Sequence, residues 1–119
     1  MNVLMIGDIC GSPGRNAVKK YIGDIKGEYK IDLVIANGEN SAGGVGITKS
    51  VLEELYSLGI DVVTTGNHIW DKKEIFEFID NEPFLIRPAN YPPASPGKGY
   101  CIYKHKNIII GVVHISVRT

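Results

Sequence analysis

The sequence has few cysteines, a single tryptophan and no excess of either charge, and these shortages exclude several classes of protein. Cys10 and Cys101 are its only cysteines, too few for a small disulfide scaffold. Free thiols are typical of reducing compartments, so we expect a cytoplasmic protein. Thirteen Lys and Arg residues balance 13 Asp and Glu residues. This balance argues against general nucleic-acid binding, which requires many cations to neutralise phosphates.

Long hydrophobic runs are also missing. None approaches the ~20 residues that cross a bilayer. The N-terminus meets an acid at Asp8 and lacks the basic region of a signal peptide. The sequence therefore predicts no membrane association. A length of 119 residues suits one domain, and we expect residues 1–119 to be part of a single domain.

Glycine, by contrast, is abundant, and it follows the apolar runs. Runs over 2–7, 31–37 and 60–65 predict three short strands, the first of the buried parallel type. Each run leads to a glycine, at position 7, 38 or 66. The side chains that follow these glycines are Asp8, Glu39, Asn40, Asn67 and His68.

The segments between and after these runs predict an α/β fold. Helices are expected over 13–27, over 49–58 behind a Thr48 cap, and over 72–81 behind Asp71. A fourth strand over 84–86, a proline-rich loop over 87–99 and a hairpin of 100–104 with 107–115 follow. The order β-α-β-α-β-α-β predicts parallel strands with helices on the sheet faces.

The polar strand endings predict a metal site. Carboxyl ends of parallel strands lie along one edge of a sheet, so we expect the five side chains to meet there. Carboxylate, amide and imidazole donors suit Mn²⁺, Fe or Mg²⁺ better than a structural zinc ion. Glu39, between the other two endings in sequence, is the expected bridge between two ions. The alternative is that each residue only caps a strand or forms a turn.

His68 and Asn67 are adjacent, so they cannot point the same way along an extended chain. One interpretation has Asn67 facing a metal while His68 faces the substrate as a general acid. In the alternative, His68 orients a metal ligand instead.

Other residues have two interpretations each. Arg87 could reach a phosphate with its forked guanidinium, or pack or form a salt bridge. The loop 41–46 could wrap a substrate or simply turn the chain. Trp70 is expected to pack in the core first and to line the pocket second. His105 falls in the predicted hairpin turn, where we expect it to be solvated.

The motifs carry a resemblance to a known family. G-D at 7–8, N-G-E-N at 37–40 and G-N-H at 66–68 resemble the blocks of the calcineurin-like metallophosphoesterases. Cys10 stands where the first block has a histidine, and Glu39-Asn40 replaces the aspartate of the second. With G-D-x-x-G-S-P-G-R, G-N-H-x-W-D-K-K-E and R-P-A-N-Y-P, the chain is similar to the YmdB-like branch, described as 2′,3′-cyclic-nucleotide 2′-phosphodiesterases.

The resemblance implies a four-layer α/β/β/α sandwich, of which this chain would be the N-terminal half. It implies two divalent ions, Fe, Mn or Mg, and a phosphodiester substrate such as a 2′,3′-cyclic nucleotide. By motif, Asp8, Glu39, Asn40 and Asn67 would be metal ligands and His68 the catalytic acid. Three further histidine ligands would come from a later half, so the metal site would be incomplete here.

An incomplete site predicts a chain that is inactive alone. An open sheet edge predicts a homo-oligomer. The alternative function is a non-catalytic fragment that acts as a binding or assembly module; the amount of metal bound per chain distinguishes the two. A Rossmann-like nucleotide module is disfavoured, because Asp8 and Glu39 would face the phosphates.

Overall fold

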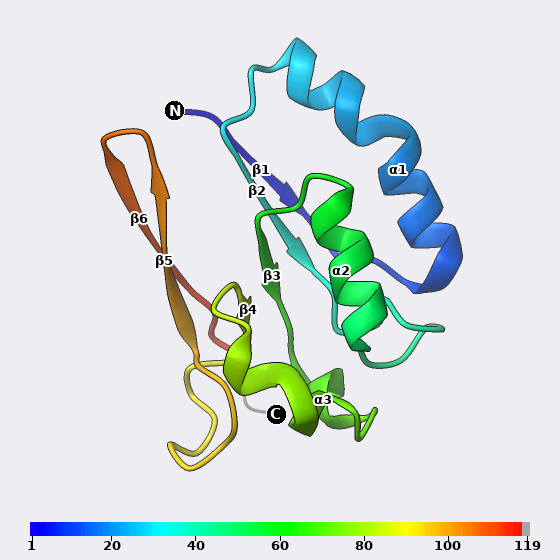
Figure 1. Ribbon diagram of the computed structural model, residues 1–119, viewed down its shortest axis with the longest axis vertical. Coiled ribbons are helices and arrows are strands. Elements are labelled where there is room, and N and C mark those ends of the chain that lie inside the picture. The colour runs from blue at the N-terminus through cyan, green and yellow to red at the C-terminus, as the bar shows by residue number, and fades with distance from the viewer. Residues whose placement is uncertain (118–119) are drawn as a thin grey trace.

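The computed structural model describes residues 1–117 and has three layers (Figure 1): helices, a parallel sheet and a hairpin. In chain order the elements are β1 (Val3–Ile6), α1 (Gly11–Glu28), β2 (Leu33–Asn37), α2 (Lys49–Ser57), β3 (Val62–Thr64), η1 (Asn67–Trp70), α3 (Ile75–Phe78), η2 (Ile79–Asn81), β4 (Leu85–Ile86), β5 (Tyr100–His105) and β6 (Ile108–Val113). The η elements are 3₁₀ helices. No helix within residues 1–117 is both long enough and apolar enough to cross a bilayer.

The main sheet has the order β1-β2-β3-β4, and all its neighbouring strands are parallel. The α/β prediction and the C-terminal hairpin are confirmed, and β4 joins the three predicted parallel strands. Because the sheet is parallel and in chain order, the carboxyl ends of β1, β2 and β3 follow one another along one edge. This edge is at the lower end of Figure 1.

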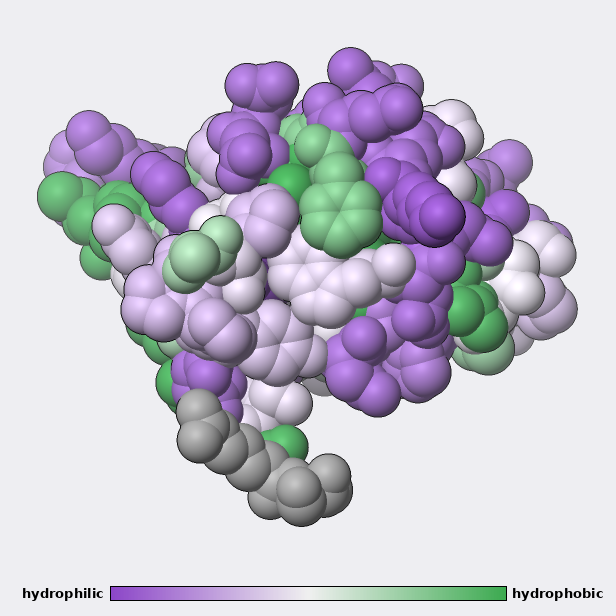
Figure 2. Space-filling model, turned by 90° about the horizontal axis from the view of Figure 1, so that it is seen from below, coloured by the Kyte–Doolittle hydropathy of each residue, from purple (hydrophilic) through white to green (hydrophobic). Residues whose placement is uncertain are grey.

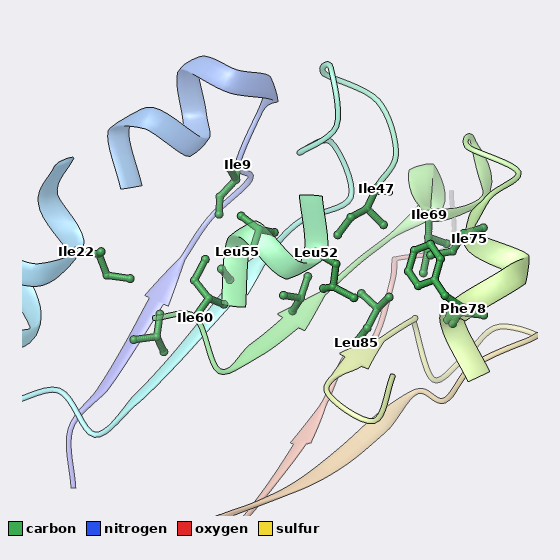
Figure 3. Close-up of a cluster of buried hydrophobic side chains, with 14 residues drawn as sticks. Ile9, Ile22, Ile47, Leu52, Leu55, Ile60, Ile69, Ile75, Phe78 and Leu85 are labelled. Carbon is green, nitrogen blue, oxygen red and sulfur yellow. The ribbon is translucent and has the colours of Figure 1, made fainter. Parts of the chain in front are cut away.

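The helices cover one face of the sheet, where apolar strand residues meet them. Leu52 and Leu55 of α2 are fully buried against Val34 and Val63 of the sheet, in the larger of two clusters (Figure 3). Burying a leucine of this kind stabilises the fold by about 1.5–3 kcal/mol. Val34 and its neighbours in β2 are buried on both faces of the sheet.

The hairpin covers part of the opposite face. Cys101 of β5 and Val112 of β6 pack on Leu33, Ile35 and other residues of β2, β3 and β4. The same face continues onto β1, where Val3 and Met5 pair with Leu33 and Ile35 but remain 46% and 73% exposed. The prediction that the first strand is buried was therefore wrong, because the two-stranded hairpin is narrower than the sheet and leaves this face of β1 exposed.

The ends of α2 agree with the sequence. The Thr48 hydroxyl accepts a hydrogen bond from the N–H of Val51 at 3.3 Å, which is the predicted N-cap. Gly59 follows the helix with a φ of +102°, a backbone conformation that residues other than glycine rarely adopt.

The predicted third helix over 72–81 was wrong in its extent. Only Ile75–Phe78 is α-helical, between the 3₁₀ helices η1 and η2. The physical reason lies in Asp71, the residue expected to cap this helix. Its carboxylate contacts the ring of His68, and α3 begins without a side-chain cap.

Candidate functional site

The tips of β1 and β2 are joined through Asp8 and Asn40. The amide Nδ2 of Asn40 donates to both carboxylate oxygens of Asp8, each at 3.1 Å. Main-chain hydrogen bonds support this pair: the N–H of Ile9 donates to the carbonyl of Asn37 at 3.1 Å, and the N–H of Gly11 donates to the carbonyl of Asn40 at 2.9 Å. Because Nδ2 faces Asp8, the amide oxygen that could ligate an ion is not part of this contact.

The tips of β2 and β3 are joined through Glu39. Its Oε2 accepts the main-chain N–H of His68 at 3.0 Å. Within its own loop, Asn37 holds Glu39 from two sides: the Glu39 N–H donates to Asn37 Oδ1 at 3.2 Å, and Asn37 Nδ2 donates to Glu39 Oε1 at 3.4 Å. The carboxylate therefore lies between the main chain of His68 and the loop that carries it.

Gly66 is the residue that makes room for this carboxylate. A Cβ atom at position 66 would lie 2.5 Å from Oε1 and 2.7 Å from Oε2 of Glu39. Its φ of −150° is accessible to any residue, so the requirement for glycine is one of space. The glycine before Asn67 is thus explained by the carboxylate that packs against it.

His68 forms a second polar pair with Asp71. The ring Nδ1 lies 2.6 Å from Oδ2 of Asp71, and the side chains are 43% and 37% exposed. This hydrogen bond raises the pKa of His68, with further contributions from the charges of Asp71, Glu39 and Asp8, while desolvation lowers it. His68 thus lies within the field of both predicted carboxylate ligands, with its ring held through Nδ1.

Asn67 is the member of the predicted set that remains apart. It is exposed at the start of η1, and no hydrogen bond within residues 1–117 joins its amide to the other four. The same described residues contain no group of three or more His, Cys, Asp or Glu side chains arranged to hold a metal ion.

Arg87 is placed differently from the predicted phosphate contact. It is only 6% exposed, and its guanidinium donates to the carbonyls of Pro88, Ser95 and Pro96. These bonds hold the proline-rich loop, which favours the packing interpretation.

The glycine-rich loop after Asn40 is held by Arg15 of α1, which also contacts α2. Arg15 of α1 donates to the carbonyl of Ser41 and pairs with Glu54 of α2 at 2.5 Å. Ser41 is buried, and its hydroxyl donates to the carbonyl of Gly38 at 2.6 Å. The loop that carries Glu39 and Asn40 is therefore held in a defined conformation by these contacts.

Sequence reasoning missed the role of Asp71. The residue was interpreted as a helix start, although its spacing of three residues from His68 places both on one side of a single helical turn. That i, i+3 spacing is the signal that could have identified it.

Comparisons with known proteins identify the family of this chain. Residues 4–119 match the family described as YmdB-like protein. The chain belongs to the YmdB-like family. It is 48% identical to the 2′,3′-cyclic-nucleotide 2′-phosphodiesterase of Bacillus subtilis, over 100% of this chain and 45% of that protein. It is 38% identical to a putative phosphatase/phosphodiesterase of Mycoplasma genitalium, over 97% of this chain and 42% of that protein.

Solved structures share the fold. A hypothetical protein from Thermus thermophilus superposes with a TM-score of 0.88 at 41% identity, over 97% of this chain and 44% of that one. A phosphatase from Mycoplasma pneumoniae superposes with a TM-score of 0.87 at 30% identity, over 95% of this chain and 42% of that one. The YmdB-like chain described here thus spans less than half the length of these relatives.

Proposed function

We propose that this YmdB-like chain carries part of a metal-dependent site that hydrolyses phosphodiesters. The observation that supports it best is the pair of contacts joining three strand tips, Asn40 to Asp8 and His68 to Glu39. A set of turn-forming residues requires no such convergence. Relatives that carry phosphodiesterase or phosphatase names support the class of reaction.

The ligands in this proposal are Asp8, Glu39, Asn40 and Asn67. Their donors are carboxylate and amide oxygens, which fit Mn²⁺, Mg²⁺ or Fe. The space that Gly66 leaves for the Glu39 carboxylate fits a residue held at a defined point between two strand tips. Two divalent ions, when bound, would polarise the phosphoryl oxygens of the substrate.

His68 is the proposed acid. With Nδ1 engaged by Asp71, the other ring nitrogen, Nε2, is the atom that can give a proton to the departing oxygen. The Asp71 carboxylate fixes the ring orientation in the way that a buried aspartate orients a catalytic histidine elsewhere. Glu39 contributes to this arrangement by accepting the main-chain N–H of the same residue.

The proposed substrate is a 2′,3′-cyclic nucleotide or a similar phosphodiester, on the basis of the Bacillus subtilis relative. The chain alone is proposed to turn over little substrate. Four oxygen donors cannot fill two coordination spheres of about five or six ligands each. We also propose a cytoplasmic location, since both thiols, Cys10 and Cys101, are free.

Calorimetric titration with Mn²⁺ tests the proposal on this chain. We expect weak binding by the parent chain, no binding by Glu39→Gln, and unchanged binding by His68→Ala. Asp24→Asn, on the exposed side of α1, is the matched control for loss of a carboxylate. At the equivalent positions of a full-length relative, His68→Ala should lower turnover by roughly 10²–10⁴-fold. Loss of Mn²⁺ from His68→Ala would make it a ligand instead of an acid.

The second candidate function is a binding or assembly module, and the hairpin supports it. Ile109 and Val113 of β6 are 69% and 62% exposed on its outer side, beside Ile102 of β5 at 51%. The N–H of His114 donates to the carbonyl of Gly99, and every second residue of β6 before it bonds to β5 in the same way. The main-chain N–H and C=O groups of residues 109, 111 and 113 therefore point to the opposite edge of β6, away from β5. Among residues 1–117, β6 pairs only with β5. Oligomer formation without Mn²⁺ binding would favour this function over catalysis.

A further inference from the structure

Three aromatic side chains form a row next to the polar cluster. The rings of Trp70 and Phe76 are stacked, with centroids 5.4 Å apart and planes 11° from parallel. The ring of Tyr91 is also next to Trp70, with its centroid 6.4 Å away and its plane tilted by 34°. The first two belong to η1 and α3, and the third to the loop after β4, so tertiary folding brings the row together.

The row begins at the candidate site. Trp70 closes the 3₁₀ helix that contains His68. Desolvation raises the pKa of the Tyr91 phenol, and the charge of Glu39 adds to this effect. The aromatic row therefore adjoins the 3₁₀ helix that carries His68.

The three rings of this row are not fully buried in the hydrophobic core. Trp70 and Tyr91 pack at the margin of the larger cluster and stay partly exposed. The residues of α3 that point into the core are Ile75 and Phe78, which are 0% and 5% exposed, whereas Phe76 is 53% exposed. Figure 2 shows this end of the molecule from below, where nearly colourless and pale green side chains gather among polar ones.

We propose that Trp70, Phe76 and Tyr91 form a stacking surface for the planar base of a nucleotide substrate. This inference rests on the proposed function, in which the strand tips hold the phosphodiester. A nucleotide carries its base on a ribose next to the phosphate, so the surface that receives the base has to adjoin the phosphate site. Aromatic side chains stack on every base because every base has a π face. We therefore expect purines to bind more tightly than pyrimidines and otherwise little selectivity.

The fluorescence of Trp70 provides a direct test, because it is the only tryptophan of the chain. We expect adenosine and 2′-AMP to quench it with saturation, and ribose 5-phosphate and inorganic phosphate to leave it unchanged. Phe76→Leu and Tyr91→Leu should each weaken 2′-AMP binding by about tenfold, which lies within the loss of affinity expected when one aromatic side chain no longer stacks on a base. Tyr29→Leu, exposed at the far end of α1, should leave binding unchanged.

Two outcomes distinguish this inference from the proposed function. Mn²⁺ binding that depends on Glu39, without saturable quenching by adenosine, would overturn the stacking surface and leave the metal site standing. Saturable quenching by adenosine that Phe76→Leu and Tyr91→Leu weaken would support the surface even in a chain that binds no Mn²⁺. Equal binding of adenosine by the parent chain and both variants would also overturn it.

Discussion

The main-chain N–H of His68 donates to Oε2 of Glu39 at 3.0 Å, so a carboxylate from the tip of β2 is bound by the segment that follows β3. The same carboxylate lies where a side chain at Gly66 would be. This relationship couples Glu39 with Gly66 and His68, two positions that are far from it in the sequence. It also means that the site can be disturbed without changing a ligand.

Gly66→Ala is the substitution that tests this coupling. The three atoms nearest the new methyl group all belong to the flexible end of Glu39, so we expect the carboxylate to move, with less than about 1 kcal/mol lost in the free energy of unfolding. Mn²⁺ affinity should fall at least tenfold in a calorimetric titration.

Gly23→Ala is the matched control for this substitution. A Cβ there meets nothing within 4 Å on exposed α1, so it should stabilise the chain by about 0.5–1 kcal/mol and leave Mn²⁺ binding unchanged. Unchanged Mn²⁺ affinity in Gly66→Ala would contradict the placement of Glu39 in the site.

Asp71→Asn should change the tautomer of His68. The carboxylate accepts a hydrogen bond from Nδ1–H at 2.6 Å in the parent chain, which favours the tautomer with hydrogen on that nitrogen. An amide can accept through its oxygen but binds the ring less strongly. Nitrogen NMR of the labelled imidazole should show a larger Nε2–H population in the variant, and identical spectra would argue against the contact.

Asp32→Asn should change how stability depends on pH. The carboxylate accepts the main-chain N–H of Asn2 at 2.8 Å, which lowers the pKa of Asp32, and the charge of His105, 3.3 Å away, lowers it further. Because the pKa is lower in the folded chain, the ionised group stabilises the fold above its unfolded pKa. That contribution is lost as the pH falls through the folded pKa.

Urea unfolding at several pH values measures this effect. Asp32→Asn should be less stable than the parent chain near neutral pH, and the difference should disappear at strongly acidic pH. Asp24→Asn, a solvent-exposed change on α1, serves as the control. A constant difference across the whole range would rule out ionisation of Asp32 as the cause. The contact with His105 also corrects the expectation that this histidine is only solvated.

The two cysteines should differ in reactivity. Cys10 is exposed, whereas Cys101 is 5% exposed in the interface between hairpin and sheet, and desolvation raises the pKa of its thiol. Since the thiolate is the reactive form, a thiol reagent should modify one cysteine rapidly in the folded chain and two after denaturation. Cys10→Ser should abolish the rapid phase, and its persistence would show that the hairpin opens readily.

Ile109→Lys should weaken self-association of the chain. A charge on the outer side of β6 opposes pairing of that edge with another strand. Light scattering should show an assembly in the parent chain and a smaller species in the variant. Tyr29→Lys, which replaces an exposed aromatic residue just after α1 with lysine, should leave the assembly intact. A parent chain that is monomeric at high concentration would remove the basis for this proposal.

Much of the fold followed from local patterns in the sequence. The apolar runs predicted the strands, and Thr48 predicted the start of α2, because these signals depend on a few neighbouring residues. The predicted meeting of Asp8, Glu39 and His68 depended on one further rule, that parallel strands end at a common edge. Each of these interpretations needed only residue order and the period of a helix or strand.

The sequence by itself determined which residue types follow each strand, and therefore the chemistry available at that edge. Only the tertiary structure decided their partners. Asp71 contacts the ring of His68 instead of capping a helix, the guanidinium of Arg87 lies buried under its own loop, and Tyr91 joins Trp70 from a distant segment. Such choices arise because a polar or aromatic side chain has several possible partners of similar energy. Which one it contacts depends on distances that exist only after the sheet, helices and hairpin have packed.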